Sequence, residues 1–134
     1  MRPQRVAEAA RALVGAPFKL YGRSHDTGID CVGVALHALA AVGLPIPKLP
    51  PYRLRNRDPA TLIERVAPNG LLRDAPGPVV AGDIVVVRPG PGQAHCMVAV
   101  PYAAFVHAHA GLGRVVLMPA PGPWPIATIF RIHP

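Results

Sequence analysis

The segment Gly28-Ile29-Asp30-Cys31-Val32-Gly33, followed by the apolar stretch Val34 to Val42, decides how the rest of this chain is interpreted. It places a cysteine in the first turn of a predicted helix. The first backbone N–H groups of a helix have no internal partner, and the macrodipole puts partial positive charge there. A thiolate is stabilised at such a position, and the thiolate is the nucleophilic form of cysteine. Cys31 is therefore a candidate nucleophile.

Two histidines far downstream are the candidate partners of this cysteine. His95 begins an apolar run, and His107 lies within Phe105-Val106-His107-Ala108. Neighbouring antiparallel strands joined by a turn over residues 100–104 can bring the two histidines side by side. One imidazole can then take the thiol proton while the second holds its orientation. A cysteine followed much later by histidines is typical of a cysteine hydrolase whose site is assembled by folding.

Side chains alternate between the two faces of a β-strand, and this alternation indicates which neighbours share a face with the two histidines. His109 shares a face with His107 on a regular strand, which makes it a reserve candidate. Cys96 follows His95 directly, so it points to the opposite face and is expected in the core.

Three other readings of the same residues remain open at this point. A cysteine in an apolar helix is often an inert small hydrophobe. The two cysteines could form one disulfide, although Cys31 would then be lost to chemistry. Cys31, His95, His107 and His109 are suitable zinc ligands, but Cys31 lacks the close sequence partner of most structural zinc sites, so no metal is expected.

Composition indicates one domain over residues 1–134. A chain of 134 residues that is 51% hydrophobic can close a single core, and its 18 prolines and 13 glycines suggest a loop-rich domain. We expect no membrane span, because no apolar stretch of about 18 residues occurs. The segment Met1 to Val14 carries several arginines and lacks the apolar core of a signal peptide, so synthesis in the cytoplasm without an export signal is expected.

The chain is strongly basic, with 14 Lys and Arg against 7 Asp and Glu, a net charge of +7. Such a charge favours an anionic partner or serves solubility alone. The densest basic cluster, Arg53 to Arg57, has only Tyr52 as an aromatic neighbour, so nucleic-acid binding is weakly supported and not expected.

Apolar periodicity predicts helices first and strands afterwards. Helices are predicted over residues 5–14 and 31–42, and a short third helix is predicted to start at Asp58-Pro59 after a Pro-rich surface connection at about 45–59. Residues 18–30 are predicted to be a loop. Short strands are predicted over 83–88, 96–100, 104–108, 114–118 and 126–132, as a meander. This order predicts an α+β fold with N-terminal helices packed on a small antiparallel sheet or half-barrel.

Several segments together follow one known pattern. They are Ala12-Leu13-Val14-Gly15-Ala16-Pro17-Phe18, the segment around Cys31, Ala81-Gly82-Asp83-Ile84-Val85-Val86, His95 with its apolar run, Phe105 to Ala108, and Pro123-Trp124 to Arg131. In this combination they resemble the NlpC-type cell-wall peptidases, which are papain-like cysteine hydrolases of bacteria and their phages. The resemblance covers most of the chain outside the Pro-rich segment.

This resemblance implies roles for three residues. Cys31 would be the nucleophile, His95 the general base and His107 the orienting third residue, without metal or cofactor. The implied reaction is hydrolysis of the γ-D-glutamyl–diaminopimelate bond in peptidoglycan stem peptides. The variant Asp-Cys-Val-Gly looks most like short members encoded with phage tails or gene-transfer agents, which implies assembly proteins of such particles as partners and action in a particle or at the cell wall.

Some positions depart from the family pattern. Val32 stands where many members have serine, Phe18 where many have tyrosine, and Met97 where glycine is usual. Phe18, Val32 and Asp30 are the substrate-binding candidates. Asp30 could contact a substrate amine or cap the helix, and capping is favoured because Asp is a preferred N-cap. The rival functions are a non-catalytic virion or wall-binding component that keeps the fold, and a related thiol amidase or acyltransferase.

Overall fold

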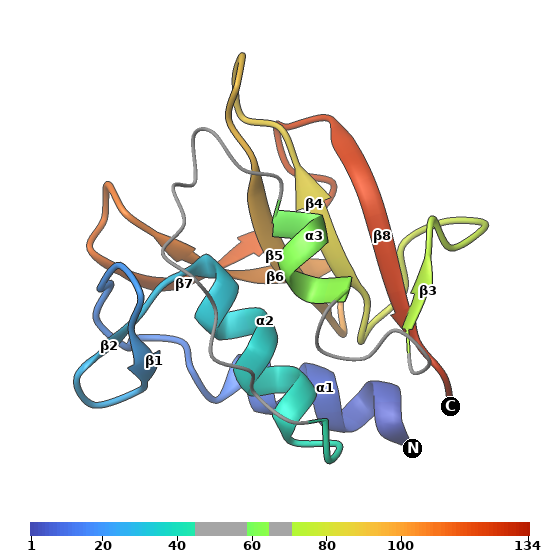
Figure 1. Ribbon diagram of the computed structural model, residues 1–134, viewed down its shortest axis with the longest axis horizontal. Helices are drawn as coiled ribbons and strands as arrows, with labels where there is room; N and C mark the ends of the chain where they lie inside the picture. The colour runs from blue at the N-terminus through green and yellow to red at the C-terminus, as the bar shows by residue number, and fades with distance from the viewer. Residues whose placement is uncertain (45–58, 65–70) are drawn as a thin grey trace.

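The computed structural model describes residues 1–44, 59–64 and 71–134. Most of the predicted Pro-rich connection, the basic cluster Arg53 to Arg57 and Asp58 lie outside these residues. In chain order the elements are α1 (Arg2–Arg11), β1 (Arg23–Ser24), β2 (Gly28–Ile29), α2 (Cys31–Ala40), α3 (Pro59–Glu64), β3 (Leu71–Arg73), β4 (Ile84–Val87), β5 (His95–Val100), β6 (Ala104–His109), β7 (Arg114–Pro119) and β8 (Ile126–Ile132) (Figure 1).

Six strands form one antiparallel sheet in the order β3-β8-β4-β5-β6-β7. The five predicted strands are confirmed, and β4 to β7 follow one another as a meander. The prediction of a meander is wrong for β8, which returns to pair between β3 and β4. The sequence analysis also missed β3 and the β1–β2 hairpin inside the predicted 18–30 loop, because strands of two or three residues are too short to show alternation.

Helices α1 and α2 pack on one face of this sheet (Figure 1). Helix α2 is buried on nearly every side, as its continuous apolar sequence predicts. In β4, β5, β6 and β8 the even-numbered residues face the helices and join them in the main core, among them Ile84, Val86, Val98 and Val106. The predicted α+β architecture is confirmed.

The Ala81-Gly82-Asp83 segment ties α1 and β8 to the start of β4. Gly82 has a φ of +96°, and a Cβ there would lie 2.6 Å from the carbonyl oxygen of Pro3, so a side chain does not fit. The buried Asp83 carboxylate accepts from Arg131 at Nε and Nη2, each at 3.0 Å. The hydrogen bond to Asp83 raises the pKa of Arg131. This segment thus holds β4, the strand beside β5, in place.

A second, smaller cluster covers the other face of the sheet. It contains Val85, Val87, Met97, Ala99 and Phe105, and Trp124 packs against it. By strand alternation, His95 and His107 share this face with Met97 and Phe105. The two candidate histidines lie just outside the paired part of β5 and β6, which ends at Val98 and Val106, and beside Trp124.

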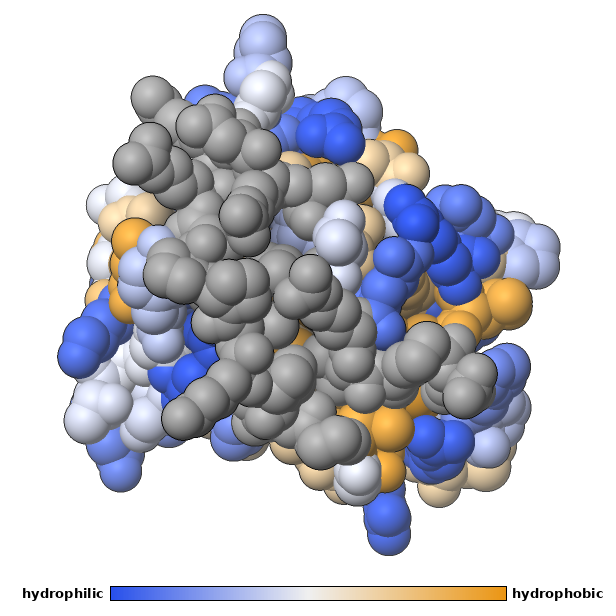
Figure 2. All heavy atoms as spheres, in the orientation of Figure 1, coloured by the Kyte–Doolittle hydropathy of each residue, from blue (hydrophilic) through white to orange (hydrophobic). Residues whose placement is uncertain are grey.

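Figure 2 shows one face of the molecule, on which most of the described surface is hydrophilic and small hydrophobic patches lie between the hydrophilic side chains. This pattern agrees with the dispersed basic residues of the sequence. Within the described residues, none of the helices has the length and apolar character that crossing a bilayer requires.

Candidate active site

Asp30 fixes the start of α2 and therefore the position of Cys31. Its carboxylate accepts from the Gly33 N–H at 2.8 Å, the Tyr21 N–H at 2.8 Å and Arg23 Nη1 at 2.9 Å. The predicted N-cap role is confirmed. The side chain is fully buried and surrounded by these donors, so the alternative of a substrate contact at Asp30 is not supported. The sequence analysis did not find Arg23, whose ion pair with Asp30 forms only when the β1–β2 hairpin folds against α2.

Close packing explains why Gly33, the last residue of the Gly28-to-Gly33 segment, is a glycine. A Cβ at Gly33 would lie 2.5 Å from the carbonyl oxygen of Gly22. The hairpin backbone therefore packs directly on the first turn of α2, and only glycine permits this approach. The segment around Cys31 is thus constrained on both sides, by the Asp30 cap before it and by this contact after it.

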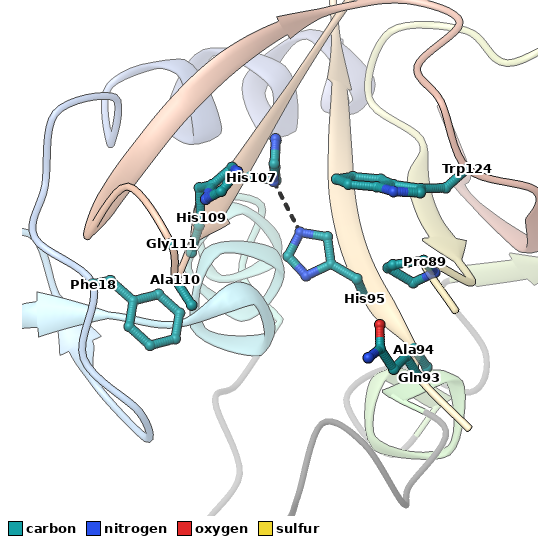
Figure 3. A pocket seen from close by; sticks show the side chains of 11 residues that line it. Phe18, Pro89, Gln93, Ala94, His95, His107, His109, Ala110, Gly111 and Trp124 are labelled. Atoms are coloured by element: carbon teal, nitrogen blue, oxygen red, sulfur yellow. Dashed lines mark hydrogen bonds between the residues drawn. The ribbon is translucent and has the colours of Figure 1, made fainter. Parts of the chain in front are cut away.

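His95 and His107 come together from neighbouring strands. The Nε2 atom of His95 lies 2.9 Å from the Nδ1 atom of His107, and the two rings are almost perpendicular (Figure 3). Strands β5 and β6 pair antiparallel around Val98 and Val106, with the turn between residues 100 and 104. The predicted juxtaposition of the two histidines is confirmed.

The environment of His107 determines its charge, and its tautomer determines the direction of that hydrogen bond. Burial, together with the neighbouring His95 and His109, lowers the pKa of His107 to about 4. Its imidazole is therefore neutral at pH 7. With its proton on Nε2, His107 accepts at Nδ1 from the Nε2–H of His95. This leaves Nδ1 of His95 for the thiol of Cys31.

Two neighbours act on the Cys31 thiol. The hydrogen bond from the Cys96 side chain, and the hydrogen bond and charge of His95, outweigh burial and lower the pKa of Cys31 to about 5. Cys31 is therefore a thiolate at neutral pH. Cys96 lies in the core on the α2 side, as predicted, and its Sγ donates to the Cys31 carbonyl oxygen at 3.2 Å. The sequence analysis missed this contact, although a side chain next to His95 on the opposite face would meet whatever packs there.

An open pocket of about 350 Å³ adjoins the histidines. Phe18 and Trp124 stand on opposite sides of the His95–His107 pair (Figure 3). The Trp124 ring is 5.8 Å from His95 and 5.7 Å from His107 between centroids, edge-on to both. Phe18 thus lines the pocket, and its contact with substrate stays a prediction. Trp124 appeared in the sequence analysis only as part of a resembling segment, and the structure makes it a wall of the pocket.

His109 also lines the pocket, as its shared face with His107 predicts. Its ring centroid is 5.7 Å from that of His107. Its Nδ1 accepts from the Leu112 N–H at 3.0 Å, whereas His107 is the residue that bonds His95. The structure therefore pairs His107, and not His109, with His95.

Cys31 and Val32 have no exposed surface, and neither lines the pocket. Cys31 is linked to the pocket through its hydrogen bond with His95. Val32 packs in the main core, so its predicted substrate contact is not supported. Both cysteines are free thiols. Over residues 1–44, 59–64 and 71–134, no three or more His, Cys, Asp or Glu side chains gather in a way that could hold a metal ion.

Comparison with solved structures places this architecture among NlpC/p60 domains. NlpC1 from Trichomonas vaginalis matches with a TM-score of 0.71 and 21% identity over 97% of this chain and 44% of that one. The peptidoglycan hydrolase RipB from Mycobacterium tuberculosis matches with a TM-score of 0.67 and 21% identity over 99% of this chain and 66% of that one. RipD from the same organism is described as a non-catalytic NlpC/p60 domain protein adapted to peptidoglycan binding. It matches with a TM-score of 0.61 and 16% identity over 99% of this chain and 97% of that one.

The fold is therefore the papain-like α+β fold of the NlpC/p60 domain. No protein-family model and no curated protein sequence matches the chain. The chain spans less than half the length of the two Trichomonas vaginalis structures, NlpC1 and NlpC2.

Proposed function

We propose that this protein is a cell-wall hydrolase, a cysteine endopeptidase of NlpC type that cleaves peptidoglycan stem peptides. The observation that carries the proposal is the hydrogen-bonded series of Cys31, His95 and His107, in which the two histidines line one pocket and Cys31 is buried behind them. A low-pKa thiolate next to an imidazole that is itself held by a third group is the arrangement that nucleophilic catalysis needs. The likeness to RipB, a peptidoglycan hydrolase, supports peptidoglycan as the substrate.

The proposed chemistry is acyl transfer. The Cys31 thiolate attacks the amide carbonyl, and the Cys31 backbone N–H at the start of α2 is the proposed oxyanion donor. His95 gives a proton to the leaving amine, and His107 holds the ring of His95 in the required orientation. Water, deprotonated by His95, then hydrolyses the thioester. We propose the γ-D-glutamyl–diaminopimelate bond as the target and, from the sequence resemblance, a phage-tail or gene-transfer-agent particle as the setting.

Digestion of purified peptidoglycan, with fragments identified by mass spectrometry, tests this proposal. Release of fragments with a free γ-D-glutamyl carboxylate by the wild type, and none by Cys31→Ala, supports it. Cleavage at the amide that joins the glycan to the stem peptide would instead identify a thiol amidase. Products in which the acyl group is moved to another amine would identify an acyltransferase.

A second candidate is a non-catalytic wall-binding component. The complete burial of Cys31 favours it, because substrate has to displace a neighbouring group before it reaches the thiol. RipD illustrates that the fold occurs in a peptidoglycan-binding protein without catalysis. Iodoacetamide at pH 7 separates the two candidates: a catalytic Cys31 is alkylated in the native protein, whereas an inert one is alkylated only after unfolding.

A further inference from the structure

The two cysteines of this chain, 65 positions apart, lie against each other. The Cys96 Sγ lies 3.2 Å from the Cys31 carbonyl oxygen, and its single S–H proton can be donated either to that oxygen or to the Cys31 sulfur. Both side chains are completely buried in the same core cluster, one at the start of α2 and the other on β5. The acyl-transfer mechanism proposed above gives Cys96 no chemical step.

The two thiols differ in their protonation. The pKa of Cys31 is lowered, chiefly by its hydrogen bond with Cys96. The pKa of Cys96 is raised by that same hydrogen bond, by burial and by the Cys31 charge. One member of the pair is therefore a thiolate that reacts first, and the other is a protonated thiol held in contact with it. A low-pKa cysteine poised beside a second, resolving cysteine is the arrangement that gives reversible oxidation.

We propose that Cys31 and Cys96 are a modification site, at which hydrogen peroxide converts the pair into a reversible disulfide that occupies the nucleophile. The Cys31 thiolate attacks a peroxide oxygen, so that a sulfur–oxygen bond forms and the oxygen–oxygen bond breaks, with release of hydroxide that takes up a proton. Cys96 then attacks the Cys31 sulfur. The sulfur–sulfur bond forms, the sulfur–oxygen bond breaks, and a second water leaves. Two electrons pass from the two thiols to one peroxide molecule.

The first step prepares the second. A sulfenic acid at Cys31 is neutral, so the Cys31 charge and the thiolate hydrogen bond that hold the proton on Cys96 both disappear. Cys96 then deprotonates more readily, and its sulfur already lies 3.2 Å from the backbone carbonyl of the residue that it attacks. Without Cys96, the sulfenic acid has no neighbouring thiol and is open to further, irreversible oxidation. The proposal does not depend on hydrolysis, because its readout is the state of the two sulfurs.

The test treats the reduced full-length protein with hydrogen peroxide at pH 7, quenches it with acid, and alkylates it with iodoacetamide in denaturant. We expect the wild type to lose both alkylatable thiols together, to stay monomeric on a non-reducing gel, and to regain both thiols with dithiothreitol. Peptide mapping should find the peptides of Cys31 and Cys96 joined. In Cys96→Ser and Cys96→Ala, the Cys31 thiol should be lost to a dimedone-reactive sulfenic acid and then to a product that dithiothreitol does not restore.

Cys31→Ser is the matched control, in which Cys96 should stay alkylatable at the same peroxide dose. Circular dichroism on each variant establishes that it is folded, and Cys96→Ser keeps a hydrogen-bond donor where Cys96→Ala does not. Three results would each overturn the proposal: a wild type whose Cys31 is oxidised while Cys96 remains alkylatable, dimers linked between molecules in place of the internal bond, or a wild type that peroxide leaves unchanged. Peptidoglycan digestion by reduced protein, measured separately, reports only on the hydrolase proposal.

Discussion

The Nε2 atom of His95 lies 2.9 Å from the Nδ1 atom of His107, with their rings at 83°. His107 is neutral at pH 7, and in the tautomer with its proton on Nε2 it accepts from His95, whose other nitrogen is then left for the thiol. One hydrogen bond between strands therefore determines which atom of the proposed base faces the proposed nucleophile.

The first prediction concerns Cys31 and His95. Cys31→Ala should abolish peptidoglycan hydrolysis, and His95→Ala should be almost as severe, because the two act as one unit. Each loss should reach about 10³-fold or more, measured as fragment release per unit time. Both variants should keep the circular dichroism spectrum of the wild type. Hydrolysis that survives Cys31→Ala would exclude the thioester mechanism.

The second prediction concerns the third residue. His107→Ala should lower kcat more than it raises KM, because His107 orients His95. His107→Gln, which keeps an acceptor, should recover part of the lost kcat. His109→Ala is the matched control on the same strand face, and its effect should be mild. If His109→Ala proved the more damaging change, the third role would belong to His109.

The third prediction concerns stability against pH. His107 has a pKa of about 4 in the folded protein against an ordinary value of 6.5. The unfolded chain therefore binds more protons between these values, so the stabilisation is present above pH 6.5 and is lost as pH falls through 4. At about 1.36 kcal/mol per pKa unit, the loss is at most on the order of 3 kcal/mol. Urea unfolding between pH 4 and 7 should give a flatter curve for His107→Gln than for the wild type, and parallel curves would contradict the assignment.

The fourth prediction concerns the thiolate. The hydrogen bond from Cys96 is the largest influence that lowers the pKa of Cys31. Cys96→Ala should therefore raise this pKa, while Cys96→Ser, which keeps a donor, should raise it less. The rate of alkylation by iodoacetamide as a function of pH measures the pKa directly. Near pH 8 the Cys96→Ala enzyme should keep most of its hydrolytic activity, and the loss should grow toward pH 6. An unchanged midpoint in Cys96→Ala would mean that His95 alone sets the charge of Cys31.

The fifth prediction concerns the net charge of +7. If this charge holds the protein on an anionic wall, binding to intact sacculi should weaken steeply between 0.01 M and 0.15 M salt, as the Debye length falls from about 30 Å to about 8 Å. Hydrolysis of a short soluble stem peptide should change far less. Joint replacement of Arg53, Arg55 and Arg57 with Gln tests the densest cluster of the sequence. Equal salt dependence for sacculi and soluble peptide would leave the charge as a solubility feature.

The sequence was enough to predict the parts of the site that depend on residues close to one another in the chain. The N-cap at Asp30 and the strand face of His107 follow from capping chemistry and from alternation, and both are confirmed. The contacts between distant segments could not be predicted in this way. The ion pair of Arg23 with Asp30 depends on how the β1–β2 hairpin packs against α2. The contact of Cys96 with Cys31 depends on how β5 packs against the same helix. Val32 was assigned by resemblance alone, and packing places it in the core.

Trp124 is the only tryptophan of the chain, and it stands edge-on to both His95 and His107. An imidazolium ring quenches indole emission more strongly than a neutral imidazole does. The protein therefore carries an intrinsic fluorophore at its proposed catalytic centre. Its emission can follow proton uptake by His107, and entry of a ligand into the pocket, in the unlabelled native chain.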